Sequence, residues 1–193
     1  MTDSDYWARY YEVTAERPAW PTVRRAIELF AAESPPRPRL AVDLGCGAGR
    51  DARELLGAGW RVIAIDRERA AIDVVEAATA ASLRVALEGR VAYLAEIDGH
   101  PCDLVDASLS LSFLPPAAFW ATWERIVAAL PVGGRIAAML FGDRDQSAAE
   151  IRARLGSFEI EHWDDREEDT QTALGEPHHF HLVELVARRV APG

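Results

Sequence analysis

The chain has 193 residues, 49% of them hydrophobic and 27% charged, and this composition excludes a disordered or collagen-like protein. Its length suffices for one sizeable hydrophobic core, so we expect a single domain over residues 1–193. The net charge of -10 creates a field that repels phosphate backbones and anionic lipid, which argues against nucleic acid and membranes as partners.

The cysteines and the N-terminal residues give an indication of the cellular compartment. Cys46 and Cys102 lack the CxxC spacing of a zinc or redox motif, and they indicate no disulfide framework. The N-terminal residues are acidic and carry no export signal, and no apolar run approaches the roughly 20 residues of a membrane span. We therefore expect a cytoplasmic protein.

The N-terminal segment carries an aromatic cluster with the spacing of one face of a short helix over residues 5–15. The four rings are Tyr6, Trp7, Tyr10 and Tyr11. A second helix is expected to begin at Pro18 or Pro21, before the proline-rich linker at residues 34–38. We expect residues 1–38 to form a helical cap, which either packs on the core or acts as a lid over the active site.

From residue 39 onward, apolar strands alternate with helices, and this alternation predicts an α/β fold with right-handed crossovers. The expected strands are 40–44, 61–65, 91–94, 104–108 and 134–141. The expected helices are 51–58, 67–81, 115–130 and 147–155. Two last strands, 158–163 and 179–188, are separated by a solvated acidic loop, so they should form an antiparallel hairpin. The expected fold over residues 39–193 is a doubly wound, Rossmann-like sheet of seven mostly parallel strands.

A glycine-rich turn follows the first strand and is the most informative motif. Asp43 ends that strand, and alternate positions are then occupied by Gly45, Gly47 and Gly49. Glycine lets the backbone turn tightly and approach a ligand closely. A dinucleotide fingerprint would need a glycine at the sixth position from Gly45, where Arg50 stands, so the ligand should lack a diphosphate.

Acidic residues mark the ends of the first three expected strands. A carboxylate at Asp43 suits a cationic amine, such as an amino-acid ammonium, better than a phosphate. Asp66 ends the second strand, where an acid lies within reach of both ribose hydroxyls. Glu96 follows the third strand, where a carboxylate can accept from the exocyclic amine of adenine and Ile97 can pack the ring. These residues predict a nucleoside ligand that carries an amino group.

The motifs resemble those of the class I S-adenosylmethionine-dependent methyltransferases over about residues 40–141. In that family the first motif is an acid, a spacer and three alternate glycines, and the second is an acid at the end of the next strand. The residues Gly49-Arg50-Asp51, the N-terminal aromatics with Arg17-Pro18, and the block 108–113 look more narrowly like the small methyltransferases grouped with tellurite-resistance and thiopurine-type enzymes. Those enzymes modify small molecules or ions.

The resemblance implies S-adenosylmethionine as the cofactor and S-adenosylhomocysteine as its product. The implied cofactor-binding residues are Asp43, Gly45, Cys46, Gly47, Gly49, Arg50, Asp66, Arg67, Glu96, Ile97 and Ser108. The residues expected in the lid or at the acceptor are Tyr6, Trp7, Tyr10, Tyr11, Arg17 and Phe113. Aromatic faces attract a cation such as a sulfonium, and an arginine can bind a carboxylate bidentately.

The sequence does not specify the acceptor atom. Amino- and nucleobase methyltransferases often carry Asn or Asp, two prolines and an aromatic residue after the fourth strand, whereas residues 110–116 here read Ser-Leu-Ser-Phe-Leu-Pro-Pro. A thiolate or selenolate acceptor needs no strong base, but a hydroxyl or amine does, and the candidate bases are His179, His181 and Asp106. We expect no metal at these histidines, because they have no obvious third ligand.

The expected function is transfer of a methyl group to a small-molecule acceptor with a sulfur, oxygen, nitrogen or chalcogen nucleophile. In such an in-line displacement, orientation and desolvation dominate the work of the protein. One alternative is a non-catalytic protein that binds S-adenosylmethionine or S-adenosylhomocysteine. Another is a nicotinamide-dependent oxidoreductase, which the glycine spacing and Asp43 argue against. We expect a monomer or a homodimer.

Overall fold

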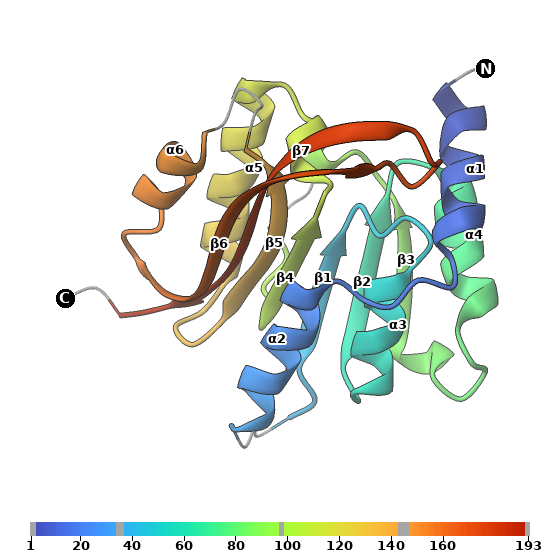
Figure 1. The fold of residues 1–193 in the computed structure, drawn as a ribbon. Coiled ribbons are helices and arrows are strands. Elements are labelled where there is room, and N and C mark those ends of the chain that lie inside the picture. Colours follow the sequence, from blue (N-terminus) through green and yellow to red (C-terminus); the bar gives the residue numbers. More distant parts are fainter. Residues whose placement is uncertain (1–2, 34–36, 97–98, 143–146, 192–193) are drawn as a thin grey trace.

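The computed structural model describes residues 3–33, 37–96, 99–142 and 147–191, which form an α/β fold (Figure 1). The strands are β1 (Leu40–Leu44), β2 (Arg61–Asp66), β3 (Leu87–Val91), β4 (Leu104–Ser108), β5 (Arg135–Phe141), β6 (Phe158–Gln171) and β7 (Pro177–Arg189). They form one sheet in the order β3-β2-β1-β4-β5-β7-β6. The strands β1 to β5 are parallel, and β7 pairs antiparallel with both β5 and β6. The predicted seven-stranded, mostly parallel sheet with an antiparallel C-terminal hairpin is confirmed.

Helices cover both faces of this sheet. One face carries α2 (Pro21–Ala31), α3 (Arg50–Gly57) and α4 (Arg69–Ala78), and the other carries α5 (Pro116–Ala129) and α6 (Ala148–Ala153). The helix α1 (Asp3–Thr14) lies beside α4 (Figure 1). The doubly wound arrangement is therefore as predicted. No helix in the described part of the chain is long and apolar enough to span a membrane.

Sequence pattern explains the central elements directly. Residues 41–44 of β1 are all buried, as expected for a parallel strand that is covered on both faces. In α2, Pro21 occupies the first turn, where its missing N–H costs nothing. The buried side chains of Val23, Ala26 and Phe30 recur at helical spacing and face the sheet.

The third strand lies earlier in the chain than predicted. Residues 91–94 form an apolar run, but β3 ends at Val91, and residues 94–96 form a short 3-10 turn, η2 (Leu94–Glu96). Leu87 pairs with Val62 and Val91 pairs with Asp66, the last residue of β2. The prediction was wrong because the boundary of this edge strand is set by its pairing with β2 rather than by its own hydrophobic pattern.

Residues 164–169 belong to β6, so the predicted acidic loop was wrong. Cross-strand polar contacts, including one ion pair, explain the difference. Arg166 donates to Glu184 of β7 at 2.7 Å, and His181 of β7 lies 2.6 Å from Asp165. Opposite charges on facing strands stabilise an antiparallel pair. The charge run therefore extends the hairpin instead of interrupting it.

The β6–β7 hairpin (red in Figure 1) extends from the β5 side of the sheet across the carboxyl ends of the parallel strands toward α1. At its tip, the carbonyl of Ala173 accepts a hydrogen bond from Arg17 at 3.4 Å. Arg17 follows α1 in the link to α2. The hairpin and the N-terminal segment thus meet above the edge of the sheet where parallel α/β sheets bind ligands.

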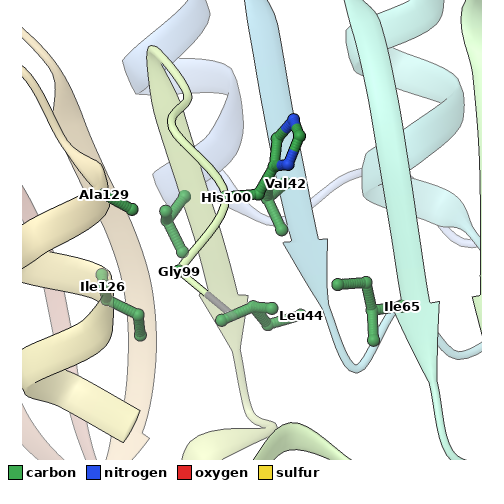
Figure 2. Close-up of a pocket in the computed structure, with 8 residues that line it drawn as sticks. Val42, Leu44, Ile65, Gly99, His100, Ile126 and Ala129 are labelled. Carbon is green, nitrogen blue, oxygen red and sulfur yellow. The ribbon is translucent and has the colours of Figure 1, made fainter. Parts of the chain in front are cut away.

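A small apolar pocket lies between the sheet and α5. Val42 and Leu44 of β1 point toward Ile126 of α5, and residues 99–100 complete the lining (Figure 2). No α-helix occurs in the described part of the connection between β3 and β4, which leaves this face thinly covered. Because side chains alternate along a strand, the pocket lies on the sheet face opposite to Asp43.

Candidate cofactor-binding site

The glycine loop joins β1 to α3 at the carboxyl edge of the sheet. Gly45, Gly47 and Gly49 have φ values of 75°, 51° and 74°, a region that residues with a Cβ rarely adopt. A Cβ at Gly45 would lie 2.5 Å from Cβ of Ser110, and a Cβ at Gly49 would lie 2.5 Å from Cγ2 of Val75. These two glycines therefore let the loop pack closely against the rest of the protein. A Cβ at Gly47 would meet only ordinary contacts.

Asp43 lies in β1 beside this loop and is 2% exposed. Its Oδ2 has no hydrogen-bond partner among the described residues. Burial raises the pKa of Asp43 well above its usual range, and the charges of Asp51 and Asp66 add to this effect. A cationic group placed here would supply both a donor and a positive charge. This carboxylate fits an ammonium group.

Asp66 connects the end of β2 to the glycine loop. Its Oδ2 accepts from the backbone N–H of Gly47 at 3.0 Å, and its Oδ1 accepts from that of Glu68 at 2.9 Å. Burial raises the pKa of Asp66, and these backbone N–H groups oppose the rise. Each carboxylate oxygen can accept a second hydrogen bond, so both remain capable of binding ribose hydroxyls.

Asp106 lies on β4 as the direct register partner of Asp43 and is 1% exposed. Ser108 donates to its Oδ1 at 2.7 Å, and the hydroxyl oxygens of Ser108 and Thr22 lie 3.3 Å apart. Burial raises the pKa of Asp106 well above its usual range, and the negative charges of Asp51 and Asp43 raise it further. The candidate base Asp106 therefore belongs to a buried acidic group beside Asp43.

Two residues of this region are absent from the sequence-based site. Asp51 is buried and accepts from the backbone N–H of Trp20 at 2.8 Å, and burial raises its pKa to about 6. Ser110 packs on Gly45, and its buried Oγ has no partner among the described residues. Only their positions in the sequence could have indicated these two residues. Asp51 directly follows Arg50, and Ser110 lies in the loop after β4.

The helix α1 places its aromatic cluster over the glycine loop. Tyr11 is buried and clusters with Ala48 of the loop and Ala71 of α4. A carbon of its ring lies 3.5 Å from the position that a Cβ of Gly47 would take. Burial raises the pKa of the Tyr11 hydroxyl, with the charge of Asp66 as the next contribution. The N-terminal segment and the loop are therefore in direct contact.

A row of aromatic rings runs from α1 to the hairpin. Within α1, the ring of Trp7 contacts the rings of Tyr6 and Tyr10, at centroid distances of 5.3 and 5.5 Å. The ring of Trp7 meets that of Phe113 edge to face at a centroid distance of 5.6 Å. Phe113 in turn meets Phe141 at the end of β5, 5.8 Å away. The last step of the row is from Phe141 to Phe180 of β7, with stacked rings 6.0 Å apart.

Three arginines named from the sequence lie around the loop. The guanidinium of Arg50 stacks 3.8 Å above the ring of Trp20. That of Arg67 lies 5.9 Å from the ring of Trp7. Arg17 is exposed and reaches the hairpin tip. The structure therefore brings all three to the same edge of the sheet as Asp43.

The remaining sequence-based candidates differ in their placement. Glu96 is exposed on η2, after the shifted third strand, and Ile97 lies outside the described residues. Cys46 is buried, and burial raises the pKa of its thiol well above the usual range. A buried thiol of this kind is a spacer rather than a nucleophile.

The two candidate histidines pair with acidic residues on the hairpin. His179 lies 2.7 Å from Asp169, and its side chain is 58% exposed. His181 lies beside Asp165, and a Cβ at Gly142 would lie 2.7 Å from its ring. Among the described residues, no group of three or more potential ligands is arranged to hold a metal ion. The structure therefore brings together Asp43, the glycines and Asp66, and it places these histidines on a separate element.

Residues 41–134 match the family model described as a methyltransferase domain. This match and the sheet order support the predicted assignment to the class I S-adenosylmethionine-dependent methyltransferases. The chain is similar to the trans-aconitate 2-methyltransferase of Acidovorax ebreus strain TPSY, with 31% identity over 156 residues that cover 78% of this chain and 55% of the relative. It thus spans about half the length of the curated relatives it matches.

Solved structures with low sequence identity share the fold. TehB from Haemophilus influenzae has a TM-score of 0.72 and 15% identity, with coverage of 89% of this chain and 62% of that one. The 1,6-didemethyltoxoflavin-N1-methyltransferase of Burkholderia thailandensis was solved with bound S-adenosylhomocysteine and has a TM-score of 0.66 and 20% identity. The match covers 97% of this chain and 87% of that one. The predicted family and fold class are confirmed, and S-adenosylmethionine is the cofactor of this family.

Proposed function

We propose that this protein transfers a methyl group from S-adenosylmethionine to a small-molecule acceptor. The observation that carries the proposal is the buried carboxylate of Asp43, whose Oδ2 lacks a partner among the described residues and which lies beside a left-handed glycine loop. An ammonium-bearing nucleoside complements this carboxylate, whereas a diphosphate would be repelled by it. The charge pattern therefore favours a methyl donor over a nicotinamide cofactor.

The proposed cofactor contacts follow from the placement of the residues. Asp43, Gly45 and Gly47 would hold the methionyl part, Asp66 and Arg67 the ribose and adenine, and Ser108 would face the sulfonium. We retain Glu96 and Ile97 as base-binding candidates. When bound, S-adenosylmethionine supplies an electrophilic methyl group. The residues of this chain then orient the acceptor and exclude water, and such orientation contributes on the order of 7–11 kcal/mol in well-aligned reactions.

The aromatic row supports a position for the acceptor. Phe113 is 50% exposed and lies between Trp7 and Phe141, so an acceptor placed near this ring would contact an aromatic surface. The relatives are named trans-aconitate 2-methyltransferases, and a polycarboxylate of that kind is therefore one acceptor to test. We keep His179, His181 and Asp106 as candidate bases only for an acceptor that must lose a proton.

We further propose that residues 1–193 form one domain, in which residues 1–38 cap a Rossmann-like core at 39–193. The packing of Tyr11 against Ala71 supports this arrangement. The acidic charge and the cysteine usage support action in the cytoplasm without nucleic acid or membrane partners. A monomer or homodimer suits a site built from one chain.

Isothermal titration with S-adenosylmethionine, S-adenosylhomocysteine and NADH tests the cofactor. We expect both sulfur compounds to bind and NADH not to bind. Asp43→Asn and Asp66→Asn should each weaken binding more than 10-fold, because each removes a charged acceptor, which is worth roughly 1.5–3 kcal/mol. Asp73→Asn is the matched control, since Asp73 lies exposed on α4.

The outcomes separate the rival functions. Binding of NADH alone would favour the oxidoreductase. Binding of the sulfur compounds without methylation of any thiol, amine, hydroxyl or carboxylic acid in an acceptor panel would favour a non-catalytic protein. Unchanged affinity in both Asp variants would refute the proposed cofactor site.

A further inference from the structure

The strand β3 forms one edge of the sheet, and in the described part of the chain no strand pairs with its outer side (Figure 1). Just after β3, the amide of Ala92 donates to the last carbonyl of β2 at 3.0 Å. Backbone groups alternate between the two sides of a strand, so the amides and carbonyls of Leu87, Gly89 and Val91 point away from β2. Apart from the amide of Leu87, which donates to Arg84, these groups have no backbone partner among the described residues. They form an open edge with which a further strand can pair.

The opposite edge of the sheet is protected against pairing with a second copy. That edge is β6, in which residues 164–169 read Asp-Asp-Arg-Glu-Glu-Asp. Two copies of β6 side by side would bring mainly acidic side chains together, and like charges on facing strands destabilise the pair. The two edges of this sheet therefore differ in what they can bind.

The side chains of β3 carry one charge of each sign around a central glycine. A Cβ at Gly89 would lie 2.6 Å from Cγ2 of Ile72, so this position faces α4. Its neighbours Glu88 and Arg90 therefore share the opposite face of the sheet, where they form an ion pair at 2.7 Å. Their side chains are 56% and 31% exposed, so both charges can reach a neighbouring molecule.

This arrangement is complementary to itself. An antiparallel pair of β3 strands with a twofold axis at Gly89 would place Glu88 of each copy opposite Arg90 of the other. The outward backbone groups belong to Gly89, so the two facing positions beside it form non-hydrogen-bonded pairs, whose Cα atoms approach to about 4.5 Å. The side chains of such pairs come closest together, and the charges would alternate in sign around the axis.

The same register matches the open backbone groups. Gly89 would exchange both of its hydrogen bonds with Gly89 of the second copy. The amide of Val91 would donate to the carbonyl of Leu87 in the second copy, and the twofold axis repeats this bond in the other direction. The pairing that aligns the charges therefore also satisfies the edge of the strand.

Exposed apolar side chains flank β3 at matching positions. Val85 and Tyr93 lie equally far from Gly89 in the sequence, and they are 93% and 60% exposed. The twofold axis would bring Val85 of one copy near Tyr93 of the other, and it would place Val91, which is 42% exposed, opposite Leu87. Apolar side chains gathered beside charged ones are typical of a protein interface.

We propose that β3 is a dimer interface and that its partner is β3 of a second copy, paired antiparallel about Gly89. The two sheets then join into one continuous sheet, and the interface is isologous. Because the strand is short, the dimer should dissociate on dilution. This inference does not rest on the proposed function, since it uses no residue of the candidate cofactor site.

Sedimentation velocity over a range of protein concentrations tests the interface. The wild-type protein should pass from monomer to dimer as the concentration rises. Glu88→Arg and Arg90→Glu should each weaken the dimer roughly 10-fold or more, because two like-charge pairs then replace two opposite-charge pairs. Glu167→Arg is the matched control, since Glu167 is exposed on β6 at the other edge of the sheet.

Mixing the two charge variants tests the register itself. In a mixed pair of Glu88→Arg and Arg90→Glu, each arginine of the first chain faces a glutamate of the second. The mixture should therefore dimerise at concentrations at which neither variant does so alone. The double variant Glu88→Arg with Arg90→Glu should dimerise as the wild type does, because it only exchanges the two charges. Damage to the fold would not be repaired by mixing.

A further pair of variants tests the apolar flank. Val85→Ser should weaken the dimer, because it removes an apolar side chain from the contact with Tyr93 of the second copy. Val132→Ser should leave the dimer unchanged, because Val132 is also exposed but precedes β5, away from this edge.

Three outcomes would overturn the proposal. The first is a wild-type protein that stays monomeric at every concentration, which would leave this edge to another partner or to solvent. The second is a dimer that persists in both charge variants, which would lie on a different surface. The third is a mixture that does not recover the dimer lost in each variant, which would refute the pairing of Glu88 with Arg90. The cofactor titrations decide the proposed function separately.

Discussion

Asp43 and Asp106 are register partners on the neighbouring parallel strands β1 and β4, and their side chains are 2% and 1% exposed. Two carboxylates in such a site cannot both ionise without strong repulsion. Burial and the acidic neighbours raise the pKa of both groups well above their usual range. Burial therefore favours the neutral form of these acids, and a bound cation would favour the charged form.

This acidic group should make stability depend on pH. Because the folded-state pKa of each acid lies above its unfolded value, the folded chain binds more protons, and stability should fall as the pH rises through that window. For Asp51 this pH window runs from the ordinary pKa of 3.8 to the folded-state pKa of about 6. Asp106→Asn should stabilise the protein by roughly 1–3 kcal/mol at neutral pH and flatten this decline. Urea unfolding across the pH range measures both effects, with the exposed Asp169→Asn as the control. An unchanged slope in Asp106→Asn would contradict the coupling.

Gly45→Ala should destabilise the protein for two separable reasons. The φ of 75° costs about 1–2 kcal/mol for alanine, and the new Cβ would lie 2.5 Å from Cβ of Ser110. Gly59→Ala is the matched control, because Gly59 has a φ of 84° with no atom within 4 Å. Adding Ser110→Gly should recover the loss from the clash but not the conformational loss. Equal unfolding midpoints for Gly45→Ala and Gly59→Ala would show that the contact with Ser110 is unimportant.

The contact of Tyr11 with the glycine loop predicts that the cofactor orders α1. Backbone amides of residues 5–14 should exchange hydrogen more slowly when S-adenosylhomocysteine is bound, because opening of this helix would then expose the ligand. Residues 148–153 of α6, on the far face, should exchange at the same rate with and without ligand. Tyr11→Ala should reduce the protection of α1 more than Tyr11→Phe. Protection that is identical in all three proteins would argue that the cap is passive packing.

For an acceptor that attacks without losing a proton, His179 should be dispensable for catalysis. Since His179 is exposed and paired with Asp169, we expect His179→Gln to change kcat by less than about 2-fold and to leave its pH profile unmoved. The measurement uses the acceptor found in the panel. A loss of about 100-fold or more, with a shifted pH profile, would restore His179 as the general base.

The centre of the fold could be predicted because its signals are local. The buried run at residues 41–44 and the alternate glycines after it define a strand and a turn within a few residues. By contrast, β3 and the acidic part of β6 depend on partners distant in sequence. Val91 ends its strand where β2 ends, and Arg166 finds Glu184 only after the hairpin has formed.

The site was predictable to the same degree. Asp66 is the last residue of β2 and Asp43 the last but one of β1, and strand ends can be read approximately from the hydrophobic pattern. Asp43 and Asp106 are register partners because the sheet order places β4 beside β1. In the sequence, β2 and β3 lie between these two strands. The contact between Phe141 and Phe180 likewise depends on an antiparallel neighbour that no local pattern reveals.

The hydrogen bond from Arg17 to Ala173 joins residues that are 156 positions apart. Such a contact forms late, because long loops must close before it can contribute. During synthesis the glycine loop and the aromatic helix leave the ribosome long before the hairpin that spans them. The candidate cofactor site around the glycine loop can therefore form early, whereas the hairpin covers the carboxyl edge of the sheet only after β6 and β7 have paired.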